Sequence, residues 1–205
     1  MIDTALAKEA WFQPDILYRD GYPAEFHSAA RRFPAIAAKI REFVAMSRAR
    51  RVLEVGPGDL PLATGSATTY VDVASVFLTG KRSAVGKIQS LPFKTNSFQL
   101  ALAIDVLPHV PPHERIASLK ELARVSERVL VFNQEYGNPD TRDSYMTATD
   151  IVNILKNVLN YDVGVTAYDS AMTTPEGERH VPLTIICAAR KKQAPPKIIR
   201  LPRRF

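Results

Sequence analysis

Short apolar runs that alternate with helical stretches are the feature that most constrains the fold of this chain. The runs expected to form strands are 51–55, 68–73, 98–104, 128–133, 162–168 and 181–189, with a weaker one at 84–88. The helical candidates between them include 113–125 and 147–160. Because parallel neighbours need a crossover connection, this alternation predicts an α/β fold with a mostly parallel, seven-stranded sheet and helices on both faces. The connections after the first two strands are short, so we expect abbreviated crossover helices there.

The length and composition suit one globular domain with two flanking segments. With 205 residues, 46% of them hydrophobic, the chain can bury one sizeable core. We expect residues 1–48 to form an N-terminal helical segment, residues 49–190 the domain, and residues 191–205 a basic tail. Pro34 stands where a helix can begin. The aromatic residues of the N-terminal segment either close over a site as a lid or pack on the sheet.

The net charge of the chain is carried by its last fifteen residues. They contain six basic residues and no acidic one, which equals the formal net charge of +6, so residues 1–190 are formally neutral. Pro195-Pro196 and Pro202 interrupt any continuous helix there. The tail is either a solvated segment or a contact for an acidic partner.

Several classes of protein are disfavoured by the composition. No stretch approaches the roughly 18 unbroken apolar residues of a membrane span, and the N-terminus lacks the pattern of a signal peptide. The only cysteine, Cys187, lies in an apolar run, which favours a buried thiol. His109 and His113 are spaced like a metal pair, but Pro111-Pro112 between them breaks a shared helix face, so no metal site is expected. We expect a cytoplasmic protein.

The strand expected at 51–55 leads into Gly56-Pro57-Gly58 and carries an acidic Glu54. In an open parallel sheet, ligands bind beyond the carboxyl ends of the strands. Glycines there allow a tight turn and a close approach of a ligand to the backbone. A dinucleotide fingerprint would place a third glycine where Pro61 stands, which weakens that interpretation. An ordinary strand-to-helix turn is the alternative.

The second expected strand ends near Asp72. A carboxylate at this position can accept two hydrogen bonds from a ribose diol, as acidic residues do after the second strand of nucleotide-binding sheets. The alternative is an aspartate that caps a helix.

A series of further motifs completes a pattern. They are Leu91-Pro92-Phe93, Ser97-Phe98, Asp105-Val106-Leu107, His109-Val110 and Glu121-Leu122-Ala123-Arg124-Val125. Together with the glycine loop and Asp72, their order and spacing over residues 50–133 resemble the class I S-adenosylmethionine-dependent methyltransferases, especially the type 11 group. The resemblance implies a single Rossmann-like three-layer sandwich and S-adenosyl-L-methionine as cofactor.

The resemblance also implies where the cofactor lies. Glu54 would face its methionine end, with the glycine loop beneath it, and Asp105 would lie beside it. Asp72 would hold the ribose hydroxyls, and Ile88, Gln89 and Ser90 would border the adenine. Val73 and Leu91 are further expected contacts of the cofactor. His109 is expected to be a general base or to orient the substrate, or else only to cap the following helix.

Three positions depart from the family pattern. Leu60 stands in place of the third glycine, Lys87 in place of an acidic residue near the adenine amino group, and Gln99 in place of an aspartate. Lysine offers no hydrogen-bond acceptor, and the amide oxygen of Gln89 is a possible substitute.

The expected function is methyl transfer to a small molecule, or to a carrier-bound or glycan-type metabolite. The alternative is a degenerate, non-catalytic binding or regulatory protein with the same fold. The stretch DVLPHVPP differs from the N-P-P-Y type of motif found in enzymes that methylate bases, which disfavours nucleic-acid substrates. Whether the acceptor is oxygen, nitrogen or carbon stays open. The long polar loop 133–146 is a further candidate for substrate contact.

Overall fold

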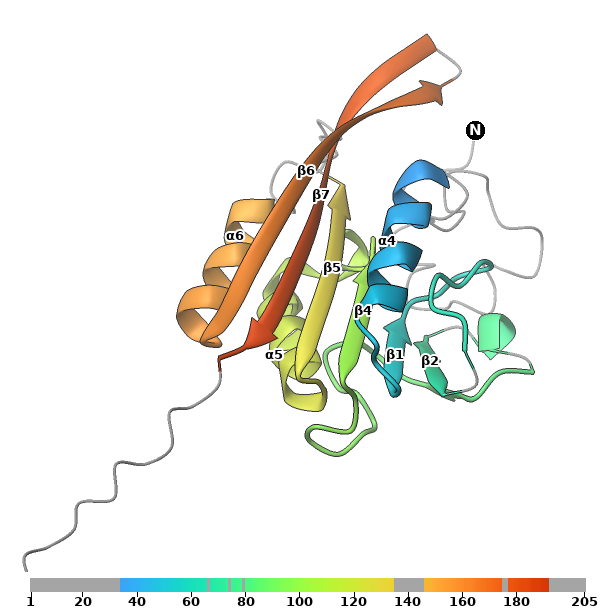
Figure 1. The fold of residues 1–205 in the computed structure, drawn as a ribbon, viewed down its shortest axis with the longest axis vertical. Coiled ribbons are helices and arrows are strands. Elements are labelled where there is room, and N and C mark those ends of the chain that lie inside the picture. The colour runs from blue at the N-terminus through green and yellow to red at the C-terminus, as the bar shows by residue number, and fades with distance from the viewer. Residues whose placement is uncertain are drawn as a thin grey trace, which may run out of the picture.

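The computed structural model describes residues 34–65, 67–73, 75–78, 80–134, 146–174 and 177–191. They form one seven-stranded sheet with the strand order β3-β2-β1-β4-β5-β7-β6 (Figure 1). The strands are β1 Val52–Val55, β2 Thr68–Asp72, β3 Ser83–Val85, β4 Leu100–Ile104, β5 Arg128–Gln134, β6 Tyr161–Thr174 and β7 Gly177–Arg190.

The sheet is parallel from β3 to β5 and antiparallel at β7. From β1 the chain moves outward to β2 and β3 and then returns to place β4 on the other side of β1. The strand order therefore reverses between β1 and β4, which is where an open α/β sheet binds its ligands. The predicted mostly parallel sheet is confirmed.

Helices cover both faces of the sheet. The helix α4, Pro34–Met46, begins at the expected proline and buries Ile36, Ala37 and Ile40. The helix α5, Arg115–Val125, and the helix α6, Ala148–Asn153, with its π-helical continuation Ile154–Val158, pack on the opposite face. Each face of the sheet has its own hydrophobic core, and alternate residues of β4 point into one or the other. Leu100 belongs to the core with α4, and Ala101 belongs to the core with α5.

The crossover connections are more irregular than expected. Among the described residues between β1 and β2, which are 56–65 and 67, the chain makes bends and turns and no helix. The connection from β2 to β3 contains a single short 3₁₀ helix, Ser75–Leu78. Pro61 has no N–H group, and the N–H groups of Leu62 and Ala63 bind the side chain of Glu54. None of these three residues can therefore donate the backbone hydrogen bond of a helix.

The strands β6 and β7 are much longer than expected and form a projecting hairpin. The strand β7 pairs with β5 only from Leu183 to Ala189. Residues 169–174 and 177–182 pair only with each other, and Figure 1 shows this arm extending past the carboxyl end of β5. The hairpin therefore projects from the same edge of the sheet at which the strand order predicts a ligand.

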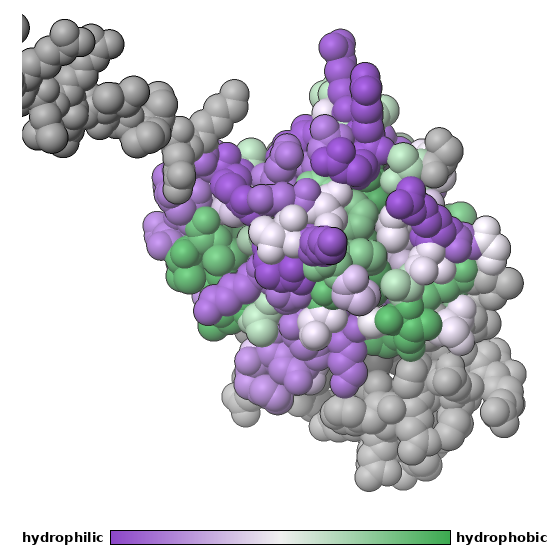
Figure 2. All heavy atoms as spheres, turned by 90° about the horizontal axis from the view of Figure 1, so that it is seen from below, coloured by the Kyte–Doolittle hydropathy of each residue, from purple (hydrophilic) through white to green (hydrophobic). Residues whose placement is uncertain are grey.

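The opposite edge of the sheet, where the parallel strands begin, faces the viewer in Figure 2. Hydrophilic side chains there surround smaller hydrophobic areas. Gln99 lies at this edge, and its amide oxygen accepts a hydrogen bond from the backbone N–H of Arg50 at 2.7 Å. This departure from the family pattern therefore lies at the end of β4 opposite to the expected site.

Several predicted features lie outside the described residues. They are most of the N-terminal segment, the greater part of the loop 133–146, and all but the first residue of the tail. In the part of the chain that is described, no helix has the length and hydropathy needed to cross a bilayer.

Candidate ligand site at the carboxyl edge of the sheet

The residues that follow β1, β2 and β4 meet at one edge because these strands are parallel neighbours. Val55 is in register with Val71 on one side and with Ala103 on the other. The backbone N–H of Gly56 donates to the carbonyl of Val71 at 2.7 Å. The loop after β1, the end of β2 and the residues after β4 thus lie side by side, as the sequence predicted.

The glycine loop adopts a conformation that other residues resist. Gly56 and Gly58 have φ values of +63° and +57°. A Cβ atom at Gly56 would lie 2.7 Å from Cγ2 of Val106, in the residues that follow β4. Position 56 therefore requires glycine both for its backbone conformation and for its contact with the neighbouring loop.

Asp105 shares this left-handed conformation without being a glycine. It follows β4 directly, has a φ of +58°, and is buried. Its backbone N–H donates to the carbonyl of Phe132 on β5 at 3.0 Å. Non-glycine residues with positive φ are uncommon and gather at functional sites. The sequence predicted the position of Asp105 beside a ligand but gave no signal for its backbone strain.

Glu54 is buried within β1, and its carboxylate holds the glycine loop in place. The backbone N–H of Leu62 donates to Oε1 at 2.8 Å and to Oε2 at 3.1 Å. The N–H of Ala63 donates to Oε2 at 2.8 Å. The Tyr70 hydroxyl of β2 donates to the carbonyl of Ala63 at 2.6 Å. The carboxylate therefore folds the loop back against the sheet, and a contact of Glu54 with a cofactor stays a prediction.

Burial and hydrogen bonding act in opposite directions on this carboxyl group. Burial raises the pKa of Glu54 by more than the N–H groups of Leu62 and Ala63 and the charges of Lys81 and Arg41 lower it, and the net pKa is about 7 instead of 4.5. Desolvation favours the neutral form, whereas amide donors favour the anion. The group is thus held near the point of titration at neutral pH.

On the other side of the sheet edge, the chain leaves β3 through a tight turn over residues 87–90. The N–H of Ser90 donates to the carbonyl of Lys87 at 3.0 Å, and Ile88 is buried while Gln89 is partly buried. These are the residues expected beside the adenine. Leu91, which follows the turn, is also buried.

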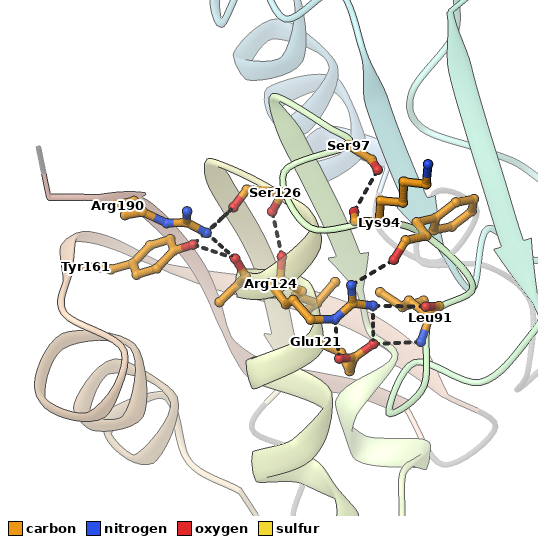
Figure 3. Close-up of polar contacts among 11 residues, drawn as sticks. Leu91, Lys94, Ser97, Glu121, Arg124, Ser126, Tyr161 and Arg190 are labelled. Atoms are coloured by element: carbon orange, nitrogen blue, oxygen red, sulfur yellow. Dashed lines mark hydrogen bonds and ion pairs between the residues drawn. The ribbon is translucent and has the colours of Figure 1, made fainter.

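The turn is anchored to α5 by an acid–base pair, which we call the Glu121–Arg124 clasp (Figure 3). The two side chains form a bidentate ion pair with distances of 2.6 and 2.8 Å. Arg124 also donates to the carbonyls of Phe93 at 2.7 Å and Leu91 at 3.0 Å. The N–H of Leu91 donates to Glu121 Oε2 at 2.9 Å.

The clasp explains why two separate sequence motifs belong together. Leu91-Pro92-Phe93 presents backbone donors and acceptors, and Glu121 and Arg124 are one helical turn apart, so their side chains meet on one face. The hydrogen bond from Arg124 lowers the pKa of Glu121. The sequence shows both motifs but does not predict the contact between them.

His109 ends a short 3₁₀ helix, Leu107–His109, after β4, and its side chain is exposed. The loop around it is held by Arg115, the first residue of α5, which is 3% exposed. Its Nε donates to the carbonyl of Val110 at 2.8 Å and its Nη2 to that of Pro108 at 3.4 Å. Burial lowers the pKa of Arg115. Sequence reasoning missed this residue, because a cation at the start of a helix is unexpected.

The structure brings most of the predicted site residues to one edge. Those that lie in or directly after β1, β2 and β4 are Glu54, Gly56, Pro57, Gly58, Asp72, Val73, Asp105 and His109. Asp72 is buried at the end of β2, and Val73 beside it is exposed. Within the described residues no group of side chains capable of holding a metal ion is found.

Comparison with known proteins agrees with this geometry. Residues 53–128 match the family model for a methyltransferase domain, type 11. A sequence comparison with curated proteins finds no match. The motif-based resemblance to the class I S-adenosylmethionine-dependent methyltransferases is confirmed by the family model.

Solved structures share the fold at low sequence identity. The YcgJ protein from Bacillus subtilis aligns with a TM-score of 0.60 at 12% identity, over 76% of this chain and 99% of that one. A SAM-dependent methyltransferase from Methanosarcina mazei aligns with a TM-score of 0.54 at 16% identity, over 73% of this chain and 98% of that one. Magnesium protoporphyrin IX methyltransferase from Synechocystis PCC 6803, with bound SAH, aligns with a TM-score of 0.56 at 16% identity, over 92% of this chain and 100% of that one. The Rossmann-like fold is therefore shown.

The raised pKa of Glu54 predicts a specific pH dependence of stability. The folded protein keeps a proton that the unfolded chain releases, so this contribution is complete below about pH 4.5 and is lost as the pH rises through about 7. Across this window the free energy of unfolding should fall by up to about 1.4 kcal/mol per pH unit at this site. Urea unfolding of Glu54→Gln should lack that slope, whereas the exposed Glu127→Gln should keep it. Parallel curves for Glu54→Gln and wild type would contradict the assignment.

The clasp should contribute measurably to stability. Replacing Arg124 by alanine removes the donors to Leu91 and Phe93 and leaves Glu121 without its ion-pair partner. The side chain is 34% exposed, so we expect a loss of about 1–2 kcal/mol in the free energy of unfolding. Lys120→Ala, an exposed position on the same helix, should cost less than about 0.5 kcal/mol. Equal midpoints in urea for the two variants would show that the clasp is energetically neutral.

Proposed function

We propose that this chain is an S-adenosylmethionine-dependent methyltransferase that acts on a small molecule, or on a carrier-bound or glycan-type metabolite. The observation that carries the proposal is the left-handed backbone of three residues at the switch point of the sheet. Gly56, Gly58 and Asp105 all have positive φ and follow adjacent parallel strands. Glycines in this conformation let the backbone approach a ligand closely, and strain at a non-glycine residue such as Asp105 is found at functional sites.

The side chains at this edge suit the chemistry of the cofactor. The buried carboxylate of Asp72 at the end of β2 is of the type that accepts hydrogen bonds from ribose hydroxyls. The apolar Val73 beside it is 44% exposed and offers a surface to the cofactor. Leu60, at the position of the third glycine, is 37% exposed, so its side chain is directed at least partly away from the interior of the loop.

In the proposed reaction the cofactor supplies a methyl group already activated on a sulfonium. The protein then has to align the acceptor with that group and exclude water, and alignment alone can contribute on the order of 7–11 kcal/mol. The exposed His109 after β4 is suited to orient the acceptor, or to remove a proton if the acceptor is an oxygen. Arg115, through its bonds to the carbonyls of Pro108 and Val110, would fix the loop that carries His109.

Binding of the cofactor is the first test of the proposal. Calorimetric titration should detect binding of S-adenosylmethionine and of its demethylated product, S-adenosylhomocysteine. Asp72→Ala should weaken binding by roughly 1.5–3 kcal/mol, because hydrogen bonds to a charged group are lost. Gly58→Val should abolish binding, since a β-branched residue resists the φ of +57°. The absence of heat with folded wild-type protein would refute the proposal.

A second prediction concerns the role of His109 once an acceptor is found. If it is a general base, His109→Asn should lower turnover by about 10²–10⁴-fold and keep the affinity for the cofactor. The exposed His113→Asn is a matched control and should turn over normally. A change confined to KM for the acceptor would assign His109 to substrate orientation alone.

A further inference from the structure

One hydrogen bond joins the turn after β3 to the loop that precedes α5. The amide Nε2 of Gln89 lies 2.5 Å from Oε2 of Glu114. The two residues are 25 positions apart in the sequence. They come from the loops after β3 and β4, and these two strands flank β2 and β1 in the sheet.

The backbone holds both partners in place. Gln89 lies in the turn closed by the Ser90-to-Lys87 hydrogen bond, and the clasp anchors the next residue, Leu91. Glu114 ends the 3₁₀ helix Pro112–Glu114, its N–H donates to Pro111 at 2.9 Å, and its carbonyl accepts from Ser118 Oγ at 3.0 Å. The side-chain bond therefore connects two loops that are already positioned.

The chemistry of the pair determines which way the amide of Gln89 faces. A carboxylate only accepts hydrogen bonds, so the NH₂ group of Gln89 must face Glu114 and the amide oxygen must face away from it. Within the described residues, no protein group donates a hydrogen bond to that oxygen. The other carboxylate oxygen, Oε1, lies 3.8 Å from Nε2 of His113, which is largely exposed.

We propose that Glu114 is a positioning residue that fixes Gln89 so that its amide oxygen accepts a hydrogen bond from the amino group of the cofactor's adenine. This inference rests on the proposed function. It assigns the acceptor that Lys87 cannot provide, since an ammonium group only donates and Lys87 is exposed. The arrangement selects for a base that presents an amino group and against one that presents a carbonyl, which would meet a second acceptor.

The selectivity can be measured with two ligands that differ at the amino group and at the adjacent ring nitrogen N1, which accepts a hydrogen bond in adenine and donates one in hypoxanthine; the variants below separate the two contributions. S-adenosylhomocysteine carries the amino group, and S-inosylhomocysteine carries a carbonyl oxygen in its place. Calorimetry should show that wild-type protein binds the adenosine compound at least about tenfold more tightly. The adenine amino group would donate a hydrogen bond to the Gln89 amide oxygen, whereas the carbonyl of the inosine compound would face that oxygen without a hydrogen bond.

Glu114→Gln is the decisive variant because it preserves size and shape. A glutamine at position 114 can donate as well as accept, so it permits Gln89 to turn its NH₂ group toward the base. The affinity ratio of the two ligands should fall to about threefold or less, with only a small loss of affinity for the adenosine compound. Gln89→Met, which removes the acceptor, should also reduce the ratio. Lys87→Ala should leave the ratio unchanged.

The outcomes separate this inference from the function on which it rests. If folded wild-type protein binds neither ligand, the proposed function fails, and this inference fails with it. If wild type binds both ligands equally, or if Glu114→Gln and Gln89→Met keep the wild-type ratio, the assignment of Gln89 and Glu114 is wrong while the proposed function stands. A purely structural role for Glu114 would weaken both ligands by the same factor and keep their ratio.

Discussion

The carboxylate of Glu54 is the contact on which the candidate site depends. It is buried inside a strand, where an acidic side chain is costly unless its oxygens are hydrogen-bonded. The N–H groups of Leu62 and Ala63 provide these bonds and in doing so draw the chain back against the sheet. The positive φ values of Gly56 and Gly58 allow that reversal. One buried acid thus determines the path of the loop that would lie under a ligand.

A second set of contacts comes from the segment 114–124, at the start of α5 and along it. Arg115 holds the loop around His109, Glu114 holds Gln89, and the Glu121–Arg124 clasp holds the residues after the turn. These residues approach the sheet edge from one side and fix the loops after both β3 and β4. The loops after β3 and β4 are therefore both held by this one segment, while Glu54 holds the loop after β1. Contacts of this kind favour a preformed site.

The sequence predicted features that depend on local pattern and missed those that depend on distant partners. Apolar periodicity located all seven strands, and the residues Gly56, Asp72 and Asp105 were placed correctly at strand ends. Glu54 binds the backbone N–H groups of Leu62 and Ala63, and Arg124 binds backbone carbonyls of residues 91 and 93. Every residue has such backbone groups, so the sequence does not indicate which of them a side chain will bind. Gln99 departs from the family pattern, but its amide oxygen binds the N–H of Arg50 at the edge opposite to the candidate site. The hairpin was predicted too short, because its outer residues are polar.

The most direct test of a cofactor site at the carboxyl edge is a crystal structure of the protein with S-adenosylhomocysteine. The ribose should lie against Asp72, the methionine portion over Gly56 and Gly58, and the adenine amino group within hydrogen-bond distance of Gln89 Oε1. A cofactor bound elsewhere on the molecule would contradict the assignment of this edge. A cofactor bound here with its adenine turned away from Gln89 would contradict only the role given to that residue and Glu114.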